Sequence, residues 1–443
     1  MQNKRILSVA MLFVVGLMLL SSVSARDWYI SINTGKGKKG TLEAPSKDIA
    51  FIINKLEAGD RIFVAGGEYK GKDGTYDINL PVEIYCGWND SFTRRDAWGE
   101  FKTVFTGEHN SANFATQYRL AIDASKAGTP LMEARGQETK HRVVVDGCIF
   151  DNGPRNYYKA GSNDALLVRK GTASDTPSPE SGGLLITTGI TSEIIVNNVI
   201  VMNTAPTVGA FSLFPGRGAK VTVTNNAAIN NTGVGFNLDT SFSADDPADY
   251  PSYTFANNIS ILNEKHDPFA TYGGSSVMLR SGTNVEMTGN IFAMNDYYGV
   301  DNARRAKDVV MTNNVFFANA FSDYLEFDTK IALEDIEDWS DLIDDASDNI
   351  KEPLNFGISE QWAAMYMARE VIDRNAAEED VQVVDSWAND VRSIFGLNLQ
   401  GTSLNVDSAV WLPRMSLDDA MTVVGRYMDA YGPFYPAAED VSP

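Results

Sequence analysis

An excess of acidic residues limits the partners that this chain can bind. Its 443 residues include 58 acidic and 37 basic side chains, which give a formal net charge of −21. A surface of that sign is a poor match for nucleic acid, and two cysteines are too few for a disulfide-rich scaffold.

The first 25 residues are predicted to be a signal peptide. Lys4 and Arg5 precede an apolar run at 6–20, and residues 23–25 are small, as a signal peptidase requires. A retained membrane anchor is the alternative, but a span needs about 20 residues. We therefore expect a mature chain that begins near Arg26, has no transmembrane span, and is secreted, periplasmic or held at the cell surface.

A short helix and a strand are predicted next, in PSKDIAFIINKLEAGDRIFVAGGEY. The helix is indicated by four apolar residues at helical spacing, which are Ile49, Ile52, Ile53 and Leu56. Gly59 and Asp60 then turn the chain into the strand RIFVA.

Six later segments share one pattern. They are VVVDGCIFDNG, IIVNNVIVMNT, VTVTNNAAINNT, YTFANNISILNE, VEMTGNIFAMND and VVMTNNVFFANA. Aligned on the second residue of the central pair, they carry Gly147, Asn198, Asn226, Asn258, Asn290 and Asn314. Five positions later each carries an asparagine, namely Asn152, Asn203, Asn231, Asn263, Asn295 and Asn319.

This repeat predicts a solenoid of stacked turns. Each unit reads as two short strands around a tight polar corner, followed by a loop of variable length, and one such unit cannot bury its own apolar face. Asparagine tolerates the left-handed backbone of a sharp corner. Its amide can also donate to an identical amide one turn away, so we expect a hydrogen-bonded ladder of asparagines.

The corners NNVFFAN and GNIFAMN resemble those of the pectate-lyase-like superfamily. The N-terminal segment is also similar to that of secreted bacterial members, in which a short helix covers the open end. The resemblance spans about residues 27–322 and implies an all-β solenoid, a right-handed parallel β-helix with an N-terminal capping helix. It implies no single function, because the superfamily includes lyases, hydrolases, epimerases, esterases and non-catalytic surface proteins.

Cys86 and Cys148 are predicted to be buried free thiols. They lie 62 residues apart, and two or three turns at about 4.8 Å each would hold their Cα atoms beyond the 7 Å that a disulfide allows. A disulfide between them is the alternative if a loop takes up part of that interval.

The segments after each repeated asparagine should lie side by side and form one wall. Their rings suit pyranose faces, and their arginines suit carboxylate or sulfate groups. The predicted substrate-binding residues are Arg155, Tyr157, Tyr158, Arg217, Tyr297, Tyr298, Arg304 and Arg305. Alternatively, the tyrosines only anchor long loops.

Three residues are candidates for proton transfer at an acidic sugar. His266 and Tyr272 lie in KHDPFATY. This segment resembles the Tyr, His and Asp group of uronate epimerases of this fold. The epimerases carry the order Asp-Pro-His, whereas this chain carries His-Asp-Pro. Arg280 is a candidate carboxylate partner or base, since a polyuronate lyase must neutralise the substrate carboxylate and remove the neighbouring proton. The alternative for His266 is an ordinary surface histidine.

An acidic loop is a candidate calcium site. DTSFSADDPADYP supplies oxygen ligands from Asp239, Asp245, Asp246 and Asp249. A solvated acidic loop is the alternative. The sequence signatures of polygalacturonase-type hydrolases, of pectin methylesterases and of Gly-x-Ser-x-Gly hydrolases are absent.

Residues 323–443 hold 26 acidic and 7 basic residues, so we place a boundary near residue 322. Amphipathic helices are predicted at 332–350, 359–375, 380–396 and 416–432, the last with a capping box at Ser416 and Asp419. We expect this region to pack on the solenoid or cap it, or to act as a lid.

Two functions remain open from the sequence. The first is an exported, monomeric, carbohydrate-associated β-helix that acts on acidic polysaccharide as a lyase or epimerase, with calcium as its only candidate cofactor. The second is a non-catalytic envelope or adhesion solenoid.

Overall fold

The structure is a computed structural model, and most of the N-terminal three quarters of the chain is described in it. The described residues are 25–70, 76–106, 120–124, 141–151, 157–158, 183–204, 209–231, 233–241, 245–263, 274–351, 393, 409–410 and 415–431. The predicted signal peptide lies outside them, apart from Ala25. No helix among these residues is long and apolar enough to cross a membrane.

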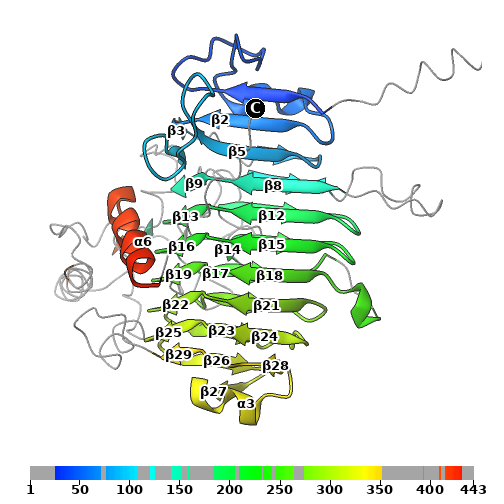
Figure 1. The fold of residues 1–443 in the computed structure, drawn as a ribbon, viewed down its shortest axis with the longest axis vertical. Coiled ribbons are helices and arrows are strands. Elements are labelled where there is room, and N and C mark those ends of the chain that lie inside the picture. Colours follow the sequence, from blue (N-terminus) through cyan, green and yellow to red (C-terminus); the bar gives the residue numbers. More distant parts are fainter. Residues whose placement is uncertain are drawn as a thin grey trace, which may run out of the picture.

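The strands form three sheets, and within each sheet they stack one above another along the long axis of the molecule (Figure 1). The first sheet contains β1 Asp27–Ile30, β2 Arg61–Ala65, β5 Glu83–Trp88, β8 Arg142–Asp146, β12 Glu193–Asn197, β15 Lys220–Thr224, β18 Ser252–Ala256, β21 Asn284–Thr288, β24 Val309–Thr312 and β28 Ile343–Asp345. The second contains β3 Gly67–Lys70, β6 Thr103–Thr106, β9 Cys148–Asp151, β13 Ile200–Met202, β16 Ala227–Ile229, β19 Ile259–Ile261, β22 Ile291–Ala293, β25 Val315–Phe317 and β29 Ile350–Lys351. The third contains β4 Tyr76–Ile78, β7 Leu120–Asp123, β11 Leu184–Thr187, β14 Gly209–Phe214, β17 Val234–Leu238, β20 Val277–Leu279, β23 Tyr298–Asn302, β26 Ser322–Glu326 and β27 Thr329–Ile331.

From β2 to β26, each turn of the chain adds one strand to each sheet, and neighbouring strands pair in parallel, which confirms the parallel β-helix. The prediction of two strands and a loop per turn was incomplete, because the segments assigned to the wall contain the strands of the third sheet, such as β14, β17 and β23. Inward side chains of all three sheets form one core, in which rings of successive turns stack. The centroids of Phe211 and Phe236 are 4.4 Å apart, and those of Phe292 and Phe316 are 5.2 Å apart.

The asparagine ladder is present at the corner between the first and second sheets. The side-chain amide of Asn226 donates to Asn258 at 3.0 Å, Asn258 to Asn290 at 3.1 Å, Asn290 to Asn314 at 2.8 Å, and Asn314 to Asn349 at 2.9 Å. A second ladder follows the second sheet, where Asn231, Asn263, Asn295 and Asn319 donate or accept in the same way.

The predicted alignment was one residue out for two asparagines. Because Asn197 pairs with Thr224, Asn198 lies opposite Asn225, and both adopt a positive φ. Asn203 likewise accepts from Asn230 at 2.8 Å. A doublet of asparagines offers an amide in either register, so the sequence pattern alone did not choose between them.

The predicted N-terminal helix consists of two 3-10 turns, η1 Ile49–Phe51 and η2 Ile53–Lys55. Asp48 caps the first turn by accepting from the backbone N–H of Ala50 at 2.8 Å. Ile49, Ile52 and Leu56 nevertheless join the core cluster at the β1 end of the solenoid, so the apolar spacing predicted the buried side chains but not the helix type.

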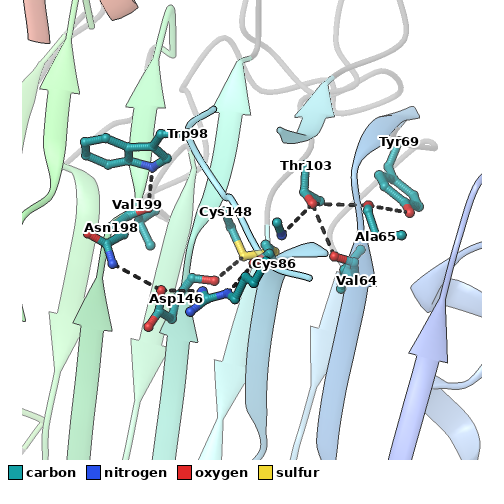
Figure 2. Close-up of a disulfide and its surroundings, with 12 residues drawn as sticks. Val64, Ala65, Tyr69, Cys86, Trp98, Thr103, Asp146, Cys148, Asn198 and Val199 are labelled. Carbon is teal, nitrogen blue, oxygen red and sulfur yellow. Dashed lines mark hydrogen bonds and ion pairs between the residues drawn. A yellow bond between two sulfur atoms is a disulfide. The ribbon is translucent and has the colours of Figure 1, made fainter. Parts of the chain in front are cut away.

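The prediction of free thiols was wrong, because Cys86 and Cys148 form a disulfide with Cα atoms 5.1 Å apart (Figure 2). The two cysteines are 62 positions apart but only one turn apart, because β5 and β8 are neighbours in the first sheet and β6 and β7 are the described strands between them. Beside the bridge, Trp98 donates its indole N–H to the backbone oxygen of Asn198 at 2.7 Å.

The solenoid continues past the predicted boundary at residue 322. β28 pairs in parallel with β24, and β29 with β25, so residues predicted as a helix at 332–350 contribute strands to a further turn. Only η6 Leu333–Asp335 and the short α3 Ile336–Trp339 are helical there. Ile336 is buried in the core cluster, and β27 turns back on β26, so this segment closes the C-terminal end.

The predicted helix at 416–432 is confirmed as α6 Leu417–Tyr431. Ser416 Oγ accepts from the backbone N–H of Asp419 at 3.0 Å, as expected of its cap. Met415 and Val423 pack in one cluster with the outward side chains of the second sheet, and α6 lies beside β13, β16 and β19 (Figure 1). The other two predicted helices lie outside the described residues except for Ser393.

Candidate functional site

Three neighbouring strands of the third sheet bring charged side chains to its outer face. In β17 and the residue after it, the core residues Phe236 and Leu238 alternate with Asn237 and Asp239, which therefore face outward. The same alternation places Arg280, just after β20, and Asp301, in β23, on the outer face. We call Asp239, Arg280 and Asp301 the acid–arginine cluster.

An ion pair forms the centre of this cluster. Arg280 Nε donates to Asp239 Oδ2 at 2.8 Å, and the two side chains are 19% and 13% exposed. Asp239 Oδ1 accepts from the backbone N–H of Thr240 at 2.8 Å, and the hydroxyl of Tyr253 donates to the Asp239 carbonyl at 2.6 Å. Asp239 is thus held in place, and it fixes the orientation of the Arg280 guanidinium.

Asp301 is the second carboxyl of the cluster. It lies opposite Met278 in the sheet, and its Oδ1 accepts from the backbone N–H of Ala303 at 3.0 Å. Burial raises the pKa of Asp301, while the hydrogen bond and the charges of Arg280 and Arg304 act in the opposite direction. A carboxyl group shifted this way exchanges its proton closer to neutral pH than an ordinary aspartate.

Asn237 is an unusual neighbour of the cluster. Its side chain is 0% exposed, and neither its amide nitrogen nor its amide oxygen has a hydrogen-bond partner among the described residues. In the sheet it lies between Ser212 and Met278. Leaving a buried amide unpaired costs on the order of 1–3 kcal/mol, so this position is not optimised for stability.

The predicted calcium ligands are not brought together. Asp239 pairs with Arg280, Asp246 caps η5 Pro247–Asp249 by accepting from Ala248 N, and Asp249 Oδ2 lies 3.7 Å from Arg217 Nη1. Asp245 is exposed. No group of three histidine, cysteine or acidic side chains that could hold a metal ion occurs in the described part of the chain, and calcium binding stays a prediction.

The predicted substrate-binding residues fall in different places. Tyr297 and Tyr298 contact each other at the start of β23, with ring centroids 4.8 Å apart. Arg304 is exposed, and its charge acts to lower the pKa of Asp301. The Arg305 guanidinium lies instead 4.1 Å from the ring centroid of Phe327. Arg217 is tied to the acidic loop.

Several predicted residues cannot be placed at the cluster. Arg155, His266 and Tyr272 lie outside the described residues. Tyr157 and Tyr158 form β10, which pairs antiparallel with β30 Ala409–Val410, and their side chains are not described.

Sequence reasoning missed Asp301, Asn237 and the ring of Phe321, which contacts Tyr297. All three lie in or beside strands of the third sheet. The alternation of apolar and polar residues in VGFNL and YGVDN would have identified two of them.

Comparison with known proteins adds a structural likeness. No protein-family model and no curated protein matches the chain significantly. A solved structure described as the crystal structure of pectate lyase Pel9A is 17% identical, over 68% of this chain and 71% of that chain, with a TM-score of 0.38. So distant a likeness carries no weight for the chemistry. The register of the three sheets itself establishes that the chain is a parallel β-helix, the fold that the resemblance to the pectate-lyase-like superfamily predicts.

Proposed function

We propose that the chain is an exported carbohydrate-active β-helix that cleaves an acidic polysaccharide by elimination at the acid–arginine cluster. The observation that carries this proposal is the placement of one guanidinium, Arg280, beside two carboxyl groups, Asp239 and Asp301, in or directly after three adjacent strands. Asp239 fixes the guanidinium through Nε.

The chemistry follows from the two kinds of group. Arg280 pairs with the carboxylate of a uronate unit, which lowers the cost of negative charge developing on it. Asp301 in its carboxylate form removes the proton from the carbon next to that carboxylate. The C–H electron pair becomes a carbon–carbon double bond as the bond to the glycosidic oxygen breaks, and that oxygen takes a proton from solvent.

An ultraviolet assay tests the proposal. The purified protein is incubated with polyuronates and sulfated uronate polysaccharides, with and without calcium, and the unsaturated product is followed by its absorbance. We expect Asp301→Asn to lower kcat by about 10²–10⁴-fold, and Arg280→Gln to lower kcat/KM through loss of the carboxylate contact. Arg142→Gln is the matched control, since Arg142 pairs with Glu83 on the first sheet.

Each outcome has a defined meaning. Formation of product that survives both cluster substitutions would place the reaction elsewhere. If no cleavage occurs but deuterium from solvent enters the sugar next to its carboxylate, the protein is an epimerase, because proton removal and return need no bond cleavage.

A non-catalytic envelope solenoid is the second candidate. The observation in its favour is that Arg280 already has a protein partner at 2.8 Å, as in a structural ion pair. If no acidic polysaccharide gives either unsaturated product or proton exchange, that result supports the non-catalytic candidate over elimination.

A further inference from the structure

A cluster of aromatic rings lies at the start of the strand that carries Asp301. The ring centroid of Tyr297 is 4.8 Å from that of Tyr298 and 4.7 Å from that of Phe321. The centroids of Tyr298 and Phe321 are 6.1 Å apart. We call these three residues the ring cluster.

The ring cluster reaches the surface through Phe321 and the half-buried Tyr297, whereas Tyr298 is buried, at 6% exposed. Phe321 is 45% exposed, and none of the three rings belongs to the core clusters of the described residues. The local backbone is already fixed without them, because Phe321 N–H donates to the Tyr297 carbonyl at 3.0 Å and Ser322 Oγ donates to the Ile331 carbonyl at 2.7 Å. The exposed ring face is therefore not explained by folding.

A cation lies over this cluster. Lys330 Nζ is 4.4 Å from the ring centroid of Phe321, and the side chain is exposed. No acidic side chain of the described residues pairs with Lys330, although Asp328 and Glu334 are close to it in sequence. Its charge is thus available to an anionic ligand.

The ring cluster and the acid–arginine cluster share β23. Tyr297, which directly precedes β23, is four residues from Asp301, so strand alternation points both to the outer face, about 13 Å apart along the strand. One extended saccharide can therefore run along this face from the Tyr297 and Phe321 rings to Asp301. Burial, and then electrostatic interactions with Tyr297 and Asp301, raise the pKa of Tyr298 to about 12.

We propose that Tyr297, Phe321 and Lys330, with Tyr298 packed beside the rings, form a sugar subsite that binds one acidic unit of the polysaccharide whose reacting unit lies at the acid–arginine cluster. The apolar C–H face of the pyranose packs on the exposed ring, and Lys330 pairs with its carboxylate or sulfate. This subsite deepens the proposed function and rests on it for the identity of the reacting unit.

Calorimetric titration of the purified protein with uronate oligosaccharides tests the subsite. Each oligosaccharide, from pectate or from alginate, is used as the free acid and as its carboxyl methyl ester. We expect Phe321→Ala to weaken binding of both forms by about tenfold. Lys330→Gln should weaken binding of the free acid alone and reduce its salt dependence.

The control is Phe327→Ala. Phe327 is 53% exposed and also carries a cation, Arg305, but makes no ring contact among the described residues. Its replacement should leave affinity unchanged. Far-ultraviolet circular dichroism and thermal unfolding verify that all three variants are folded.

The failures are distinguishable. Wild-type affinity in Phe321→Ala, or an equal loss in Phe327→Ala, overturns the subsite even if unsaturated product forms. Binding that depends on Phe321 and Lys330 without any product overturns elimination and leaves the subsite standing.

Discussion

At the residue scale, the most informative side chain is Asp301, because its catalytic role and its stability effect have opposite signs. Burial raises the pKa of its carboxyl group in the native state, so the native state holds that proton more tightly than the unfolded chain. The free energy of unfolding therefore falls as pH rises from the unfolded pKa of about 3.9 through the higher native value.

Asp301→Asn should reverse this loss, since the amide is neutral at every pH and its oxygen can still accept from Ala303. We expect the variant to be more stable than the wild type at pH 7 while losing activity. The advantage should vanish below the unfolded pKa. Urea unfolding at pH 7 and at pH 3.5 measures the stability gain and its disappearance. A variant that is less stable than the wild type at pH 7 would contradict the raised pKa of Asp301.

At the element scale, the disulfide joins β5 of one turn to the first residue of β9 in the next turn. Because its loop spans 62 residues, the double substitution Cys86→Ser and Cys148→Ser should lower the free energy of unfolding by about 4 kcal/mol. Denaturant unfolding of the variant and of wild type with and without reductant tests this. Equal midpoints for oxidised wild type and the variant would refute it.

Elements with a strong local signal were predictable, and those defined by distant partners were not. The corner asparagines and the Ser416 cap each follow from residues a few positions apart. The strands of the third sheet lack the polar corner of the repeat, so GAFSLF and VGFNL read as loops. Asp301 and Arg280 are 21 residues apart in sequence, and only the register of β20 with β23 shows that they are neighbours.

The same limit explains the errors at the C-terminal end. The acidic composition after residue 322 favoured helices, but Ile343 and Ile350 find strand partners in β24 and β25. Pairing with an existing edge decided their structure, since parallel stacking satisfies backbone groups that no local propensity could.

At the scale of the whole molecule, α6 links turns that otherwise contact only their neighbours. In a solenoid each turn is stabilised by the turns beside it. α6 packs in one cluster with β13, β16, β19, β22 and β25, and Asn203 exchanges two hydrogen bonds with the backbone of Met415, 212 residues away. The helix therefore couples several turns at once.

Loosening α6 should affect those turns together. Val423 is 0% exposed in this interface, and Val423→Ala should cost about 2 kcal/mol, through lost contacts and the cavity left behind. Thr422→Ala, on the exposed side of the same helix turn, is the control. Hydrogen exchange should show reduced protection in the second sheet from β13 to β22 for Val423→Ala alone. Loss confined to α6 would mean that the helix rests on the solenoid without coupling its turns.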